Sequence, residues 1–137
     1  MKKIFLDTNI FIDLLLHRKL DVSNADQLAD IVPLSNVYMS TLSVHITFHF
    51  VKIKHSSKLL TETEKFLSSI NLTPFSENIV INAMRSKYSD FEDTLQYLMA
   101  INADCNYILT RNKKDFEKIK KVIPSKIKIV TNISQIK

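Results

Sequence analysis

The 137-residue sequence contains no glycine and no tryptophan, and it has a single cysteine, Cys105. Without glycine there can be no glycine-rich phosphate loop and no Rossmann dinucleotide fingerprint, so we exclude both kinds of nucleotide site. Turns that need a positive φ angle must use asparagine or aspartate instead. One cysteine cannot form an internal disulfide, which fits a reducing compartment.

Long apolar runs are also missing, because no stretch of about 18 apolar residues occurs. Lys2 and Lys3 lead into only a short apolar stretch before Asp7. We therefore expect neither a membrane span nor a secretory signal, and we expect a cytoplasmic protein. With 45% apolar residues, the chain can bury about two-thirds of its unfolded surface. We expect residues 1–137 to form a single domain.

Positive charge is concentrated at the C-terminal end of the sequence. From Arg111 onwards there are nine lysine or arginine residues against Asp115 and Glu117, a net charge of +7, whereas the whole chain carries +5. A basic face beside an acidic remainder is typical of a protein that binds a phosphate backbone. A solvated, lysine-rich surface is the alternative interpretation.

The stretch from Lys2 to Leu14, KKIFLDTNIFIDL, joins an apolar strand to an amphipathic helix through a polar turn. Asp7 stands at the junction, at the carboxyl end of the predicted strand, where open α/β sheets place their ligands. The alternative is that Asp7 only caps the helix, as short polar side chains do.

The rest of the chain alternates between short apolar segments and helical patterns. This order predicts βαβ units, and so an α/β domain with a parallel sheet and helices on both faces. The predicted strands are Ile4–Leu6, Asn36–Ser40, Leu72–Phe75, Asn106–Leu109 and Ile127–Val130.

Cap signals set the expected helix boundaries. The expected helices run from the Asp7 turn to about His17–Lys19, over Asn24–Ile31 after Ser23, from Ser40 or Thr41 to about His55, from a capping box at Thr61–Glu64 to about Ile70, from Ser76 to about Tyr88, and from a capping box at Ser89–Glu92 to about Asn102. A short helix follows Thr110–Phe116. In the third helix we expect Leu42, Ile46, His49 or Phe50, and Ile53 to share one face. We expect Asn102 to take a left-handed conformation.

Four segments together resemble the landmark segments of a PIN domain, in order and spacing: FLDTNIFIDLL, STLSVHITFHFV, DFEDTLQYLMA and YILTRNKKDF. The sequence is most similar to the VapC-type toxins of bacterial toxin–antitoxin pairs. The resemblance covers nearly the whole chain and implies a five-stranded parallel sheet flanked by helices. It also implies a metal-dependent ribonuclease, a cognate antitoxin that holds it inactive, and a homodimer.

The resemblance implies a catalytic and metal-binding site. Asp7, Asp93 and Asp115 match the acidic positions of the family, and Thr110 and Asn112 match its polar pair. Oxygen ligands of this kind suit Mg²⁺ or Mn²⁺. Without a cation, clustered carboxylates raise one another's pKa values.

The expected substrate is RNA, hydrolysed by an activated water molecule. Arg111, Lys113 and Lys114 lie close to the matched segment in the sequence, and we expect them to attract the RNA backbone.

One acidic position departs from the family pattern. Family members usually carry glutamate six residues after the serine that corresponds to Ser40, and here that position is Ile46. An active endoribonuclease toxin and a non-catalytic PIN domain that binds RNA or a protein therefore both remain as hypotheses.

Three rival metal or phosphate chemistries are less well supported. His45 and His49 share a helix face, but HITFH lacks the HExxH pattern of zinc enzymes. A haloacid-dehalogenase-type phosphatase would need aspartate where Asn9 stands, and a receiver domain would need paired acids that the short stretch before Asp7 does not supply.

Overall fold

The computed structural model describes residues 2–16, 25–53, 57–86 and 90–136. Within these residues the strands form one parallel sheet with the order β3-β2-β1-β4-β5, so β1 lies at its centre. The predicted α/β architecture is therefore confirmed. The strands are β1 (Ile4–Leu6), β2 (Val37–Ser40), β3 (Asn71–Thr73), β4 (Tyr107–Leu109) and β5 (Lys128–Val130).

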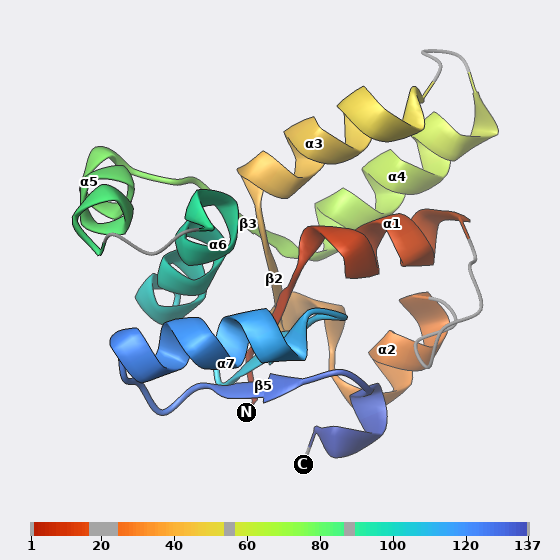
Figure 1. The fold of residues 1–137 in the computed structure, drawn as a ribbon. Helices are drawn as coiled ribbons and strands as arrows, with labels where there is room; N and C mark the ends of the chain where they lie inside the picture. Colours follow the sequence, from red (N-terminus) through yellow and green to blue (C-terminus); the bar gives the residue numbers. More distant parts are fainter. Residues whose placement is uncertain (1, 17–24, 54–56, 87–89, 137) are drawn as a thin grey trace.

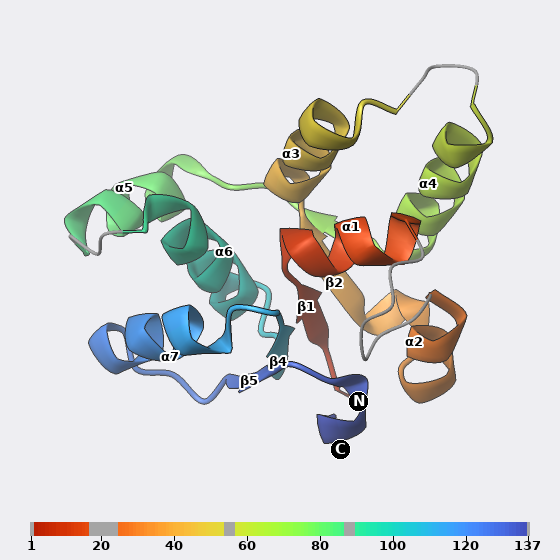
Figure 2. The ribbon, with the colours of Figure 1, turned by 45° about the vertical axis from the view of Figure 1, so that its right-hand side comes forward.

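Helices cover both faces of the sheet. Figures 1 and 2 show α5, α6 and α7 on one side and α1, α2 and α4 on the other, while α3 projects from the edge where the strands end. No helix in the described part of the chain is long and apolar enough to span a membrane. The helices are α1 (Thr8–Leu16), α2 (Ala25–Ile31), α3 (Thr41–Val51), α4 (Lys58–Ser69), α5 (Glu77–Arg85), α6 (Phe91–Asn102) and α7 (Lys113–Val122).

The central strand supplies side chains to two apolar cores. Ile4 and Leu6 face the core beneath α1 and α2, whereas Phe5 faces the core beneath α6 and α7. All three are fully buried, because a central parallel strand is covered on both faces. The apolar run IFL thus fixes β1 in the middle of the domain.

Two predicted helix starts were wrong. Helix α4 begins at Lys58, and the Ser57 hydroxyl accepts a hydrogen bond from the Leu60 amide at 3.1 Å, so Ser57 rather than Thr61 is its cap. Helix α6 is capped by Asp90, which accepts from the Asp93 amide at 2.9 Å. The predicted cap Ser89 lies outside the described residues, as do Ser23 and the predicted helix ends at His17–Lys19, His55 and Tyr88. Ser40 caps α3 and Ser76 caps α5, as predicted.

The positive φ angles also fall elsewhere than predicted. Asp104 (φ 57°) takes the left-handed position after α6, and Asn102 is the last residue of the helix. Lys52 (φ 54°) ends α3 at Val51, before the predicted end near His55. Aspartate tolerates the left-handed region because its short side chain can bond locally.

The sequence predicted one apolar face on α3, but it did not predict which side of the helix is buried. Its fully buried residues are Ser43 and Thr47, whereas Phe50 is 72% exposed. A polar pair therefore faces the domain. Half-buried Ile46 and exposed Phe50 lie on another side of the helix, and this orientation bears on the site.

Candidate functional site

Asp7 lies at the carboxyl edge of the sheet, as the sequence predicted. The register pairs Leu6 with both Met39 and Leu109, so β1 and β4 end at the same level and β2 runs one residue further. The Asp7 amide continues the ladder by donating to the Leu109 carbonyl oxygen at 3.0 Å. The next residue, Thr8, opens α1. The Asp7 side chain is thus placed at the switch from central strand to helix.

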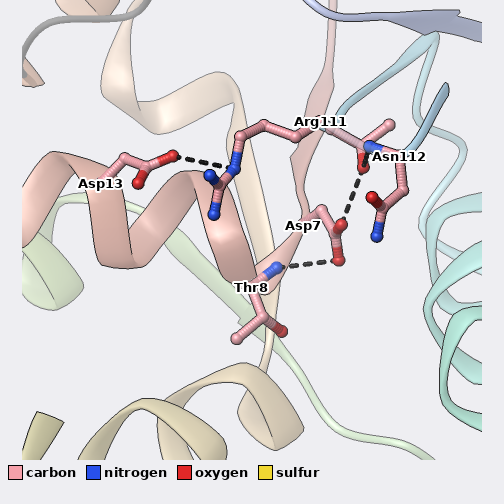
Figure 3. A network of polar contacts seen from close by, with 6 residues as sticks. Asp7, Thr8, Asp13, Arg111 and Asn112 are labelled. Atoms are coloured by element: carbon pink, nitrogen blue, oxygen red, sulfur yellow. Dashed lines mark hydrogen bonds and ion pairs between the residues drawn. The ribbon is translucent and has the colours of Figure 1, made fainter. Parts of the chain in front are cut away.

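Both carboxylate oxygens of Asp7 are held by protein donors. Oδ1 accepts from the Thr8 amide at 2.9 Å, and Oδ2 accepts from the Thr110 hydroxyl at 2.8 Å (Figure 3). The Thr110 hydroxyl in turn accepts a hydrogen bond from the backbone amide of Asn112 at 2.9 Å. Asp7 is only 4% exposed. The bond from Thr8 is local to the strand–helix junction, whereas the bond from Thr110 orients the carboxylate from another strand end.

A pocket of about 340 Å³ opens beside Asp7. Its lining brings together four carboxylates from two elements, because Asp90, Glu92 and Asp93 lie at the start of α6, facing the end of β1. The pocket is lined by Asp7, Thr8, Asn9, Ile12, Ile46, Phe50, Asp90, Glu92, Asp93 and Asn112.

Burial and mutual repulsion raise the pKa values of three of these carboxyl groups, those of Asp7, Glu92 and Asp93. Burial, followed by the charges of Asp7 and Asp90, raises the pKa of Asp93 to about 7. Burial also raises the pKa of Asp7, although the bonds from Thr110 and Thr8 and the charge of Arg111 oppose the rise. Partial burial and the charges of Asp7 and Asp90 raise the pKa of Glu92. The arrangement favours binding of positive charge, either a proton or a cation.

The structure brings together some of the predicted site residues. Asp7, Asp93 and Asn112 line one pocket, and Thr110 lies buried behind Asp7. Asp115 is half-buried in the first turn of α7 and is not among the residues that line this pocket.

Sequence reasoning missed Asp90 and Glu92. Glu92 was assigned to a capping box and Asp90 to a favourable interaction with the helix dipole. Asp90 in fact caps α6, and both residues also line the pocket. The signal was the density of acids in DFED, where three of four residues carry carboxylates.

Arg111 bridges this site to the neighbouring helix. Its Nε lies 3.2 Å from Oδ2 of Asp13, a buried residue of α1 (Figure 3). Lys113 and Lys114 are exposed at the start of α7. Arg111 therefore has a structural contact in addition to its predicted role with RNA.

The donor set fits a hard divalent cation that keeps much of its water. All polar side chains in the pocket present oxygen, or the amide of an asparagine, and Mg²⁺ is usually bound by only one or two carboxylates together with water. Among the described residues, no group of three or more His, Cys, Asp or Glu side chains is arranged so that it could hold a metal ion by itself. The pocket thus resembles an open, hydrated site more than a cage.

The other candidate ligands lie apart from this pocket. His45 and His49 are exposed on α3. The ring of His49 packs edge-on against the ring of Phe50, with the ring centroids 5.2 Å apart. Cys105 is buried, and burial raises its pKa to about 12, so its thiol is not activated.

A buried polar cluster, also missed from the sequence, joins three helices behind the pocket. Gln96 of α6 donates through Nε2 to the hydroxyls of Thr8 at 3.1 Å and Ser43 at 2.9 Å, and these hydroxyls lie 2.7 Å apart. All three residues are buried. The cluster fixes α1, α3 and α6 relative to one another, and thereby the walls of the pocket.

The fold and the site define an α/β domain that gathers carboxylates at the end of its central strand. The chain belongs to the PIN domain family, whose profile matches residues 4–122. Ribonuclease VapC1 of Aquifex aeolicus (strain VF5) is 25% identical over 119 residues, which cover 82% of this chain and 83% of that protein.

Two solved structures share the fold. DNA-bound VapBC from Salmonella typhimurium has a TM-score of 0.69 at 17% identity, covering 95% of this chain and 98% of the matched chain. FitAB bound to an IR36 DNA fragment has a TM-score of 0.65 at 18% identity, covering 98% and 97% of the two chains. At this level of identity the likeness shows the fold alone.

Proposed function

We propose that this protein is a metal-dependent endoribonuclease and the toxin of a toxin–antitoxin pair. The observation that carries the proposal is the buried, doubly hydrogen-bonded Asp7 facing three further carboxylates across one pocket. Such a group is costly to keep in a folded protein unless a cation or proton offsets the charge. Membership of the PIN family and the similarity to Ribonuclease VapC1 support the same activity.

Bound Mg²⁺ or Mn²⁺ would supply positive charge for the scissile phosphate and lower the pKa of a water molecule. Asp7 and Asp93 are the proposed main ligands, with Asp115 contributing directly or through water. Thr110 holds Oδ2 of Asp7 in place. Asn112, whose side chain lies beside Asp7 in Figure 3, would orient water or a phosphate oxygen.

Asp90 and Glu92 bear on the missing glutamate at position 46. Ile46 lines the pocket where the family usually has an acid, but two acids not foreseen from the sequence line it from α6. The negative charge of the pocket is therefore kept, although it is distributed differently. This favours the active nuclease over the non-catalytic PIN domain. The non-catalytic hypothesis is based only on Ile46 standing in the place of the usual glutamate.

The proposed partners are RNA, a cognate antitoxin and a second copy of the chain. Exposed Lys113 and Lys114 at the start of α7 lie next to Asn112 in the sequence and would contact RNA phosphates, with Arg111 beside them. The antitoxin and the homodimer follow from the VapC resemblance. Co-purification with the product of the neighbouring gene tests the antitoxin, and light scattering tests the dimer.

An RNA cleavage assay tests the activity. Labelled single-stranded RNA is incubated with Mg²⁺ or Mn²⁺, or with EDTA. We expect cleavage only with metal, and its loss in Asp7→Asn. Asp30→Asn, which removes an exposed carboxylate on α2, should retain activity. Equal cleavage by Asp7→Asn and the native protein would refute the nuclease.

A further inference from the structure

One wall of the carboxylate pocket is apolar. Ile12 of α1 and Ile46 and Phe50 of α3 line the same cavity as Asp7 and Asp93. Ile12 and Ile46 are half-buried, and Phe50 is 72% exposed. Ile46 and Phe50 lie four residues apart, which places them on one side of α3. The pocket therefore combines a charged wall with an accessible apolar wall.

Phe50 cannot be explained by the packing of its own helix. The buried side of α3 carries Ser43 and Thr47. Ser43 is bonded to Thr8 and Gln96, and these bonds fix the rotation of α3 about its axis. Ile46 and Phe50 are consequently held facing the pocket. Together with Ile12 they form an apolar patch in the pocket lining, and such patches can mark ligand-binding grooves.

The charges in the pocket limit what that molecule can be. Four acids line the cavity, and no lysine or arginine stands among the described lining residues. A polyanion gains no direct attraction here, so its affinity must come from a cation or from uncharged contacts. The flat faces of nucleobases offer such contacts, since bases stack on aromatic side chains whatever their sequence.

We propose that Phe50, with Ile46 and Ile12 beside it, forms a stacking subsite for one unpaired nucleobase next to the scissile phosphodiester. This inference rests on the proposed nuclease function, which places the phosphodiester at the carboxylates. In a duplex both faces of each base are covered by neighbouring bases, whereas single strands and loops expose them. The subsite therefore requires an unpaired base next to the bond that is cleaved. Ile46 stands where family members usually have glutamate. In this protein its side chain then contacts the nucleobase, whereas a glutamate would contact the metal site.

A double-mutant cycle between protein and RNA tests the subsite. Short single-stranded RNAs with one mapped cleavage site are made with the base present or removed at each flanking position. Base–aromatic stacking contributes about 1–3 kcal/mol, so Phe50→Ala should lower kcat/KM by about 5- to 150-fold. Removing one particular base should cost the native protein a similar factor and cost Phe50→Ala little more. Phe50→Trp should restore the difference.

Phe75→Ala is the matched control, because Phe75 is 42% exposed and lies outside the pocket; it should leave kcat/KM unchanged. A fully paired duplex should show no dependence on Phe50. If the effects of Phe50→Ala and base removal are additive at every position, the subsite is refuted. It is also refuted if Phe50→Ala converts a dimer to a monomer in light scattering without the non-additive effect, because Phe50 is then a protein contact.

Failure of the nuclease is separable from failure of the subsite. Fluorescence anisotropy measures binding of the same RNAs without cleavage. Binding that depends on Phe50 and on one base, in a protein that cleaves no RNA under any metal condition, would refute the nuclease and support the subsite. Cleavage without any dependence on Phe50 would do the opposite.

Discussion

Replacing Asp93 by asparagine should stabilise the metal-free protein at neutral and alkaline pH. Asp93 is 8% exposed, and its pKa rises from 3.8 to about 7 because of burial and the neighbouring charges of Asp7 and Asp90. The folded protein thus holds this proton more tightly than the unfolded chain does. Proton binding by Asp93 therefore contributes to the free energy of unfolding. This contribution is fully present below pH 4 and is lost as the pH rises towards 7.

The size of the effect follows from that shift. At about 1.4 kcal/mol for each pKa unit, ionisation of Asp93 lowers the free energy of unfolding by at most roughly 4 kcal/mol. Water in the open pocket screens the charges, so we expect Asp93→Asn to gain about 1–2 kcal/mol at pH 8. The gain should shrink towards pH 5, where Asp93 of the folded native protein is protonated. Cleavage should be lost at both pH values.

Urea denaturation at pH 5 and pH 8 in EDTA measures these differences. Asp104→Asn is the control, because it removes one exposed carboxylate at the amino edge of the sheet, next to Cys105 and away from the pocket. Its effect should be small at both pH values. A lower free energy of unfolding for Asp93→Asn than for the native protein at pH 8 would refute the claim that ionised Asp93 destabilises the fold. An equal gain in stability at both pH values would refute it as well.

Three further predictions concern the pocket walls and the basic helix. Ile46→Glu should tighten Mn²⁺ binding and raise cleavage by about 10- to 100-fold, which calorimetry and the RNA assay check. Replacing Lys113 and Lys114 by alanine should flatten the slope of log affinity against log salt by roughly one to two units; an unchanged slope would mean that they touch no phosphate. Gln96→Ala should cost about 1–3 kcal/mol in urea denaturation, because it removes the donor to the buried Thr8 hydroxyl; no loss would contradict the buried cluster.

The centre of the sheet could be predicted because β1 and β4 are apolar on both faces. Ile4–Leu6 and the segment before Thr110 are short apolar runs bounded by polar residues, and such runs fit only buried parallel strands in this order. Asp7 could be placed for the same reason, since its position depends only on where β1 ends. The residues next to each strand were sufficient to predict the strands and to place Asp7.

The acids of α6 could not be assigned from local signals. A carboxylate at a helix start stabilises the helix dipole whether or not it also lines a pocket, so Asp90 and Glu92 had a complete local explanation. Their second role depends on Asp7, which is more than 80 residues away in the sequence and meets them only in the folded chain.

The orientation of α3 was missed because periodicity does not say which side of a helix is packed. The spacing of the apolar residues predicted a shared face without assigning it to the core, and the hydrogen bonds that join Ser43 to Gln96 and Thr8 turn the polar side inward. The partners lie 53 and 35 residues away from Ser43 in the sequence. Only the tertiary structure reveals that the buried Ser43 hydroxyl finds hydrogen-bond partners.

Mn²⁺ binding is the measurement that tests the central claim most directly, because the account requires the carboxylate pocket to hold a divalent cation. Electron paramagnetic resonance counts free Mn²⁺ during titration of the native protein, Asp7→Asn and the control Asp104→Asn. We expect weak binding, in about the millimolar range, with Mn²⁺ bound more tightly than competing Mg²⁺. Binding should be lost in Asp7→Asn and kept in Asp104→Asn. Absence of binding in the native protein, or equal binding by Asp7→Asn, would contradict the account.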